Sequence, residues 1–203
     1  MKTVIVTGGI GSGKSAVCAL LRERGIPVYD SDSRTKTLYN RRPALLDSLE
    51  QALGTDLRGR DGLLDRAKLA GLLFADPSVR ETVEGIVYPY VLKDFRRWRS
   101  RQGQVPFVVL ESAVILSKPL FDGIAQAVVL VQAPESLRLE RVMARDGVSA
   151  QAARARMEAQ EPIPPEKAQI VLENCGSEEE LQAAVQRVFF DKNAYICKIL
   201  NPE

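Results

Sequence analysis

Residues 8 to 15 read GGIGSGKS, and this octapeptide directly follows the segment MKTVIVT. Residues 4 to 6 are all β-branched and leave no polar face, which is typical of a strand buried on both sides. The segment after the octapeptide, AVCALLRERG, places Val17, Leu20 and Leu21 at helical spacing and ends in a glycine suited to a helix C-terminus. The order of elements is therefore strand, glycine-rich loop and helix.

In this context the octapeptide matches the pattern G-x-x-x-x-G-K-[ST] of loops that bind nucleotide phosphates. We expect Gly8 and Gly13 to adopt backbone angles that a side chain would oppose, and Gly11 to let the main chain approach a ligand. Lys14 would reach the β- and γ-phosphates, and the Ser15 hydroxyl would bind Mg²⁺. A tight turn without a ligand is the alternative, and the flanking strand and helix weigh against it. The predicted nucleotide-binding residues here are Gly8, Gly11, Ser12, Gly13, Lys14, Ser15 and Ala16.

The composition narrows the chemistry that is available. With 203 residues, 45% hydrophobic and 27% charged, the chain suits one α/β core with insertions. A formal net charge of +2 does not favour a nucleic-acid or membrane-surface binder. The chain contains no histidine, which excludes Ser-His-Asp and Cys-His catalysis. Acid–base work must therefore come from Asp, Glu, Lys or Tyr.

The cysteines and the N-terminal residues indicate a compartment. Cys18, Cys175 and Cys197 show no spacing typical of metal ligands, so a reducing environment fits best. The apolar residues before the first glycines are too few for a signal peptide, and no run approaches the length of a membrane span. We expect a soluble, cytoplasmic protein.

Apolar runs between predicted helices predict a parallel sheet. Three runs predict central strands: TVIV near residue 4, PFVVL from Pro106 and AVVLVQA from Ala127. A weaker candidate, IPVYD, ends at Asp30 and is followed by Asp32. Alternating strands and helices imply βαβ crossovers, which bind ligands at the carboxyl ends of the strands. Both aspartates are therefore expected at the edge that carries the glycine loop.

Residues 45 to 101 have a helical pattern and predict an insertion at the ligand edge of the sheet. LRGRDG, near residues 57 to 62, predicts a turn. Near the end of this insertion arginines surround Trp98, which favours a solvated helix face over an anion-binding patch. These arginines are Arg96, Arg97, Arg99 and Arg101.

Residues 134 to 160 predict two helices joined by a turn at Asp146 and Gly147. Arg138, Arg141 and Arg145 are spaced to share one face of the first helix. A helical pair that carries arginines suits a lid that closes over ATP, because arginine neutralises charge on the transferring phosphoryl group. An exposed, salt-bridged helix is the alternative for each arginine.

The region from Glu166 to Phe189 predicts a short strand, a turn from Asn174 to Gly176, and a helix. Ser177 and Glu180 have the spacing of a capping box at the start of that helix. The tail from Asp191 carries no readable pattern.

Taken in order, these segments resemble the dephospho-CoA kinases, P-loop kinases that add the 3′-phosphate in the last step of coenzyme A synthesis. The resemblance runs from Met1 to about Phe190 and rests on TGGIGSGKS followed by GIPVYDSD, on LLFADPSVRETVEGIVYPYV, on RVMARDGVSAQAARARMEAQ and on IVLENCGSEEEL. It implies a nucleoside-monophosphate-kinase-like parallel sheet flanked by helices, with a helical CoA-side insertion at about 45–101 and a helical lid at about 134–162, in a single domain of residues 1–203.

The resemblance also implies a reaction and residues that carry it. The substrates would be ATP, with Mg²⁺, and the small molecule dephospho-CoA. Asp32 stands where the family has the probable base for the substrate hydroxyl. Arg141 with Lys14 would complete the catalytic set, and Asn174 lies in the adenine-side loop. No nucleic acid or membrane is expected as a partner, and the sequence does not indicate an oligomeric state.

The chain departs from the family pattern at two places. Tyr88 precedes Pro89 where the family usually shows His-Pro, which puts substrate affinity in question. Glu111 at a strand end is either a magnesium-side carboxylate or a strand cap.

Two other functions stay open: a P-loop kinase that acts on a nucleoside monophosphate, and a GTPase-like switch or ATP-binding module. The chain lacks an N-K-x-D motif, which weighs against a switch.

Overall fold

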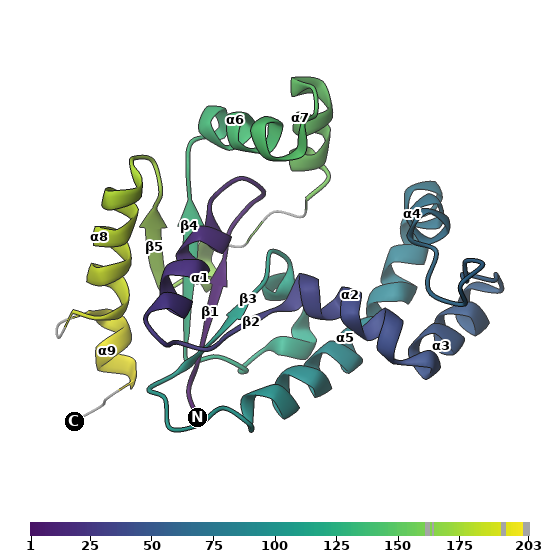
Figure 1. The fold of residues 1–203 in the computed structure, drawn as a ribbon, viewed down its shortest axis with the longest axis horizontal. Helices are drawn as coiled ribbons and strands as arrows, with labels where there is room; N and C mark the ends of the chain where they lie inside the picture. Colours follow the sequence, from purple (N-terminus) through teal and green to yellow (C-terminus); the bar gives the residue numbers. More distant parts are fainter. Residues whose placement is uncertain (161–162, 164, 192–193, 201–203) are drawn as a thin grey trace. The chain divides into compact units, whose positions relative to one another are not determined.

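The computed structural model describes residues 1–160, 163, 165–191 and 194–200, and for residues 74, 77, 195 and 200 it describes the backbone alone. Within this part of the chain five parallel strands form one sheet in the order β2-β3-β1-β4-β5 (Figure 1). The strands are β1 (Thr3–Thr7), β2 (Val28–Asp30), β3 (Val108–Glu111), β4 (Ala127–Gln132) and β5 (Ile170–Glu173). The predicted parallel α/β sheet is confirmed.

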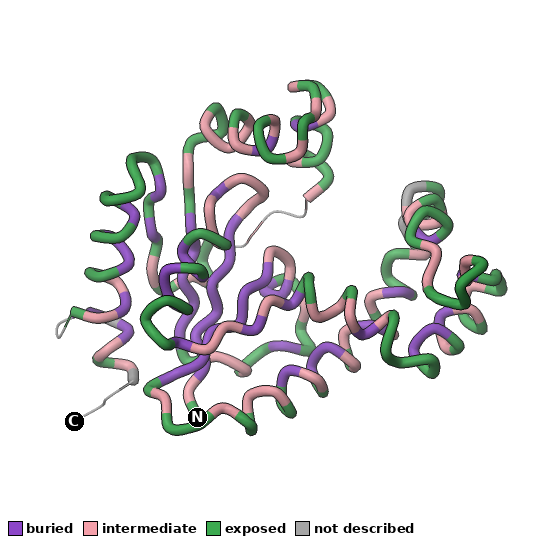
Figure 2. The backbone as a smooth tube through the Cα atoms, in the orientation of Figure 1, coloured by how far each residue is buried: buried purple, intermediate pink, exposed green. Residues whose placement is uncertain are grey.

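The sheet and its helices belong to the first of two compact units, which comprises Met1–Asp30 and Gln102–Glu203. Every residue of the central strand β1 is buried, as the absence of a polar face predicts (Figure 2). Val4 and Val6 point into a core shared with Val129 of β4 and with two helices, α1 (Lys14–Glu23) and α8 (Glu178–Phe189). The short helix α9 (Tyr195–Leu200) packs on α8. Because β1 is the central strand, the glycine loop that follows it begins at the middle of the sheet.

The helix α8 begins as its sequence predicts. The Ser177 hydroxyl accepts the N–H of Glu180, and the Glu180 carboxylate accepts the N–H of Ser177 at 2.9 Å. This capping box satisfies two N–H groups that the helix itself leaves unpaired.

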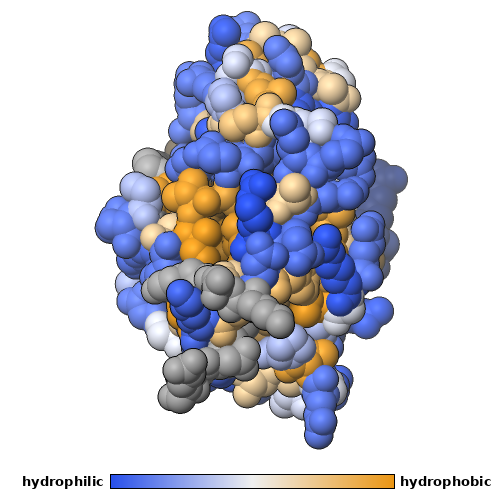
Figure 3. Space-filling model, turned by 90° about the vertical axis from the view of Figure 1, so that its left-hand side faces the viewer, coloured by the Kyte–Doolittle hydropathy of each residue, from blue (hydrophilic) through white to orange (hydrophobic). Residues whose placement is uncertain are grey.

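The remaining helices of this unit lie near the carboxyl ends of the strands or after them. They are η1 (Ile115–Ser117), η2 (Pro119–Phe121), α6 (Glu135–Asp146), α7 (Ala150–Glu158) and η3 (Pro165–Lys167). Gly147 ends α6 at φ 63°, which confirms the turn predicted there. Figure 3 views the side on which α8, α9 and the edge strand β5 lie in Figure 1, and apolar side chains show among polar ones. Val171 of this edge strand is 47% exposed.

The second unit, Ser31–Arg101, is helical, as predicted for most of its length. It consists of α2 (Ser31–Arg41), α3 (Pro43–Leu53), α4 (Arg66–Ala75) and α5 (Pro77–Arg99). Its buried residues include Leu45 and Leu49 of α3 and Phe95 of α5. Arg99 lies over the Phe95 ring at 5.6 Å, and Trp98 is half-buried. This unit begins at Ser31, before the predicted start near residue 45, and the assignment of residues 1–203 to a single domain stays a prediction.

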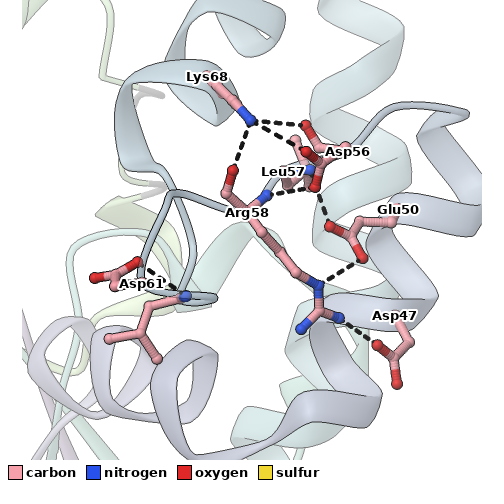
Figure 4. A network of polar contacts seen from close by, with 8 residues as sticks. Asp47, Glu50, Asp56, Leu57, Arg58, Asp61 and Lys68 are labelled. Carbon is pink, nitrogen blue, oxygen red and sulfur yellow. Dashed lines mark hydrogen bonds and ion pairs between the residues drawn. The ribbon is translucent and has the colours of Figure 1, made fainter.

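The loop between α3 and α4 is fixed by charged side chains (Figure 4). The Arg58 guanidinium pairs with Asp47 and, through Nε at 3.1 Å, with Glu50 of α3. The Lys68 ammonium of α4 donates to the carbonyl of Arg58 at 2.6 Å. Since Arg58 lies in the segment LRGRDG, these bonds hold the predicted turn between its two helices.

No helix of the described residues is long and apolar enough to cross a membrane.

Candidate active site

The glycine loop runs from the end of β1 at Thr7 to the start of α1 at Lys14. Gly11 and Gly13 have φ of 80° and 91°, so both lie in the left-handed region that side chains oppose. Gly8 does not, and the prediction that it supplies an unusual backbone angle is wrong. A Cβ at Gly8 would instead come within 2.6 Å of the Val131 carbonyl oxygen on β4. Gly8 is required for space rather than for its dihedral angles.

Two neighbouring segments pack directly on this loop. A Cβ at Gly11 would come within 2.5 Å of the main-chain oxygen of Arg138 in α6. A Cβ at Gly13 would collide with the side-chain amide of Asn174, which follows β5. The loop is therefore enclosed by α6 and by the turn after β5, the two segments predicted to face the nucleotide.

The N-terminus of α1 carries the predicted phosphate ligands. Gly13 is its N-cap, Lys14 its first residue, and Ser15 and Ala16 are exposed. The first N–H groups of a helix lack intrahelical acceptors and carry the positive end of the helix dipole, which favours anions. In the described part of the chain the Lys14 ammonium has no ion-pair partner, so its charge is available to a ligand.

The carboxylate of Glu111 lies beside three side chains of α1. Its carboxylate is 5% exposed and accepts the Ser15 hydroxyl hydrogen at 2.6 Å. Arg22 of α1 approaches the same carboxylate at 3.6 Å. Burial raises the pKa of the Cys18 thiol, and the nearby Glu111 charge raises it further. Ser15, Cys18 and Arg22 occupy positions i, i+3 and i+7 of α1, and this helical spacing predicts that they share one face.

The Ser15–Glu111 contact fits a magnesium ligand. A hydroxyl has one hydrogen and two lone pairs, and Ser15 gives its hydrogen to Glu111. The lone pairs of its oxygen remain for a hard cation, which prefers oxygen ligands. The described residues hold no cluster of three or more Asp, Glu, Cys or His side chains that could bind a metal ion.

Arg141 and Asn174 lie together beside the loop. The Arg141 guanidinium donates to the Asn174 carbonyl at 3.1 Å and to its side-chain oxygen at 3.4 Å. The Asn174 amide donates in turn to the carbonyl of Ser12 at 2.8 Å. Arg141 and Asn174 border a cavity of about 500 Å³, which is also lined by Gly13, Ala16, Leu20 and Ser177. The structure thus brings Arg141, Asn174 and the loop together beside one cavity.

The three arginines of α6 have different partners. Arg138 Nε donates to the Ile10 carbonyl in the glycine loop at 2.8 Å. Arg145 instead bonds Asp146 at 2.7 Å, and Arg156 of α7 bonds the same carboxylate at 2.8 Å. The Arg145 contact, with the help of Arg156, holds the pKa of Asp146 below its usual range. Arg145 therefore has the partners of a salt-bridged helix, and Arg138, which the predicted site omitted, contacts the loop.

The two predicted aspartates lie on different elements. Asp30 is the last residue of β2, in register with Glu111 of β3. Asp32 is the second residue of α2, so the two aspartates do not share one extended segment. Helical geometry begins at Ser31 and sets the direction of the Asp32 side chain. Its role as a base stays a prediction. Tyr88 is half-buried on α5 of the second unit.

Comparisons with known proteins agree on one family. The family model described as dephospho-CoA kinase matches residues 2–180. A dephospho-CoA kinase from Porphyromonas gingivalis is 45% identical over 161 residues, which cover 79% of this chain and 78% of that protein. The crystal structure of TT1252 from Thermus thermophilus is 37% identical, with a TM-score of 0.76, and the match covers 91% of this chain and 94% of that one.

A solved dephospho-CoA kinase from Campylobacter jejuni shares the fold, with a TM-score of 0.64 at 20% identity over 93% of this chain and 96% of that one. The glycine loop, the arginine-bearing helix α6 and the Asn174 turn all fall within the segment that the family model matches. The chain belongs to the dephospho-CoA kinase family.

Proposed function

We propose that this chain transfers the γ-phosphoryl group of ATP to the ribose 3′-hydroxyl of dephospho-CoA, with Mg²⁺ as the metal ion. The observation that carries the assignment is the family match over residues 2–180. The geometry of the glycine loop supports the donor side of the reaction. The near-neutral charge of +2 suits a small-molecule substrate. The cysteine spacing favours a reducing compartment, which supports a cytoplasmic enzyme.

On the donor side, positioning and charge supply most of the catalysis. The Ser12 N–H already donates to the Gly9 carbonyl at 3.1 Å, so the N–H groups of Gly11, Gly13, Lys14 and Ser15, with the Lys14 ammonium, would hold the phosphates. Arg141, fixed by Asn174, presents its remaining N–H groups beside the loop. Because arginine has a planar fork of donors, it can bind phosphoryl oxygens without losing its anchor. The transferring group would thus lie between Lys14 and Arg141.

The Mg²⁺ ion would be held by the Ser15 hydroxyl, with Glu111 accepting its hydrogen. When bound with ATP, such an ion neutralises charge on the β- and γ-phosphates. The Glu111 carboxylate fixes the direction of the Ser15 oxygen and adds negative charge at the metal side of the loop.

On the acceptor side, the hydroxyl must lose its proton as the new bond to phosphorus forms. Without histidine in the chain, a carboxylate is the available base. Asp32 is our proposed base, because it follows the strand next to β3 by two residues and stands in the first turn of α2. Its acceptor oxygens would orient the hydroxyl and take the proton late.

An assay of ADP release with four parallel acceptor conditions tests this function: dephospho-CoA, AMP, GMP and none. Of the four acceptor conditions, we expect turnover only in the one that contains dephospho-CoA. Turnover with AMP or GMP would favour a nucleoside monophosphate kinase, and equal turnover without an acceptor would favour an ATPase.

Lys14→Ala should remove turnover with an unchanged melting temperature. A loss of less than about tenfold, or about 1.4 kcal/mol in barrier, would contradict the loop assignment.

A further inference from the structure

Ile10, at the tip of the glycine loop, is bonded through both of its main-chain groups. Its N–H donates to the Gln160 side-chain oxygen at 2.7 Å, and its carbonyl accepts from Arg138 Nε at 2.8 Å. Arg138 lies in α6, and Gln160 follows the end of α7 by two residues. Both ends of the α6–α7 helical pair therefore hold the same residue of the loop.

Gln160 also reaches a third segment. Its side-chain amide donates to the carbonyl of Ala113 at 3.4 Å, two residues after Glu111 at the end of β3. One half-buried amide thus bonds to both the loop tip and the segment after β3. An amide has the donor and the acceptor that this pair of main-chain groups requires.

The Ile10 N–H is the one directly before the set expected to bind phosphate, which runs from Gly11 to Ser15. Gly9 and Gly11 flank it, and glycines lose more conformational freedom on ordering than other residues. A loop held at Ile10 before ATP arrives has already lost this freedom, so less is lost on binding. The hydrogen bond from Ser12 N–H to the Gly9 carbonyl, at 3.1 Å, closes the turn around the same peptide.

We propose that Gln160 is a positioning residue for ATP: it fixes the tip of the glycine loop to the α6–α7 pair and so keeps the loop in its phosphate-binding shape. It touches neither substrate in this proposal and acts through Ile10. The inference rests on the proposed function for the identity of the ligand. It adds a residue whose role depends on its bond to a main-chain N–H rather than on charge.

The test uses Gln160→Met, which keeps the length of the side chain and removes both polar groups, together with Gln160→Ala. Gln151→Met is the matched control, because Gln151 is an exposed glutamine on α7 with no bond to the loop. In the ligand-free protein, hydrogen exchange at the Ile10 N–H should be faster in both Gln160 variants. Binding of a non-hydrolysable ATP analogue should weaken by about five- to tenfold, the net value of roughly one hydrogen bond.

Further readouts separate positioning from a structural role. The KM for ATP should rise with the Kd, while kcat at saturating ATP and the melting temperature stay near wild type. Gln160→Glu keeps an acceptor for Ile10, so exchange at this N–H should stay slow. Unchanged exchange at the Ile10 N–H and unchanged ATP affinity in Gln160→Met and Gln160→Ala would overturn the proposal. An equal loss of ATP affinity in Gln151→Met would overturn it too. Wild-type turnover with dephospho-CoA tests the function independently, so either idea can fail alone.

Discussion

Replacing Glu111 by glutamine tests the buried carboxylate that holds the predicted magnesium ligand. The substitution keeps the shape and leaves an oxygen to accept the Ser15 hydroxyl, now 2.6 Å from Glu111. A charge-assisted hydrogen bond contributes about 1.5–3 kcal/mol and a neutral one about 0.5–1.5 kcal/mol, so the change removes about 1–1.5 kcal/mol. If this energy is expressed only in the MgATP complex, kcat/KM for ATP should fall about five- to tenfold.

The fold should tolerate this change. Arg22, a second charge beside Glu111, is 43% exposed and 3.6 Å away, so its guanidinium keeps its contact with solvent when the carboxylate becomes an amide, and the loss is about 1 kcal/mol or less. The melting temperature should therefore move by no more than about 2–4 °C. The assay is ADP release at varied MgATP, with Arg22→Gln as the control that removes the ion pair and spares Ser15. Loss of less than twofold in Glu111→Gln, or an equal loss in Arg22→Gln, would refute the reasoning.

Three further predictions concern α6, the base and a helix cap. Arg141→Ala should lower kcat more than it raises the Kd for ATP, whereas Arg145→Ala, which bonds Asp146 instead, should leave kcat unchanged; equal effects in steady-state kinetics would contradict this. Asp32→Asn should lower kcat by about 100-fold or more and Asp30→Asn much less, at constant melting temperature, and small equal effects would remove the general-base role. Ser177→Ala should lower the melting temperature by about 2–4 °C, since losing the cap of α8 costs about 1 kcal/mol; an unchanged thermal denaturation curve would contradict it.

Local patterns predicted the elements well where one physical constraint dominates. The β-branched run at β1, the spacing of α1 and the capping box at Ser177 each follow from burial or from unpaired N–H groups within a few residues. Gly147 likewise ends α6 in the left-handed conformation expected for a C-terminal glycine. Such features need no information about distant parts of the chain.

Contacts between distant segments were harder to predict. The sequence could not show that a Cβ at Gly8 would meet β4, because that contact depends on sheet order. Gln160 looked like any polar residue after a helix, and its bond to Ile10 joins residues 150 positions apart. The direction of the Asp32 side chain was not predictable either, because it depends on α2 beginning at Ser31. The identities of site residues were readable, but several of their partners were not.

The order of the sheet has a consequence for synthesis on the ribosome. β1 is among the first residues made, yet both of its neighbours, β3 and β4, come from residues 108 to 132. At about 5–20 residues per second, this apolar strand waits roughly 5–25 s after its own synthesis for both pairing partners. The contiguous unit Ser31–Arg101 is complete before either neighbour has been made. A nascent chain halted between Glu111 and Ala127 would hold the finished helical unit and a central strand still open along one edge, exposed to chaperones and to other chains.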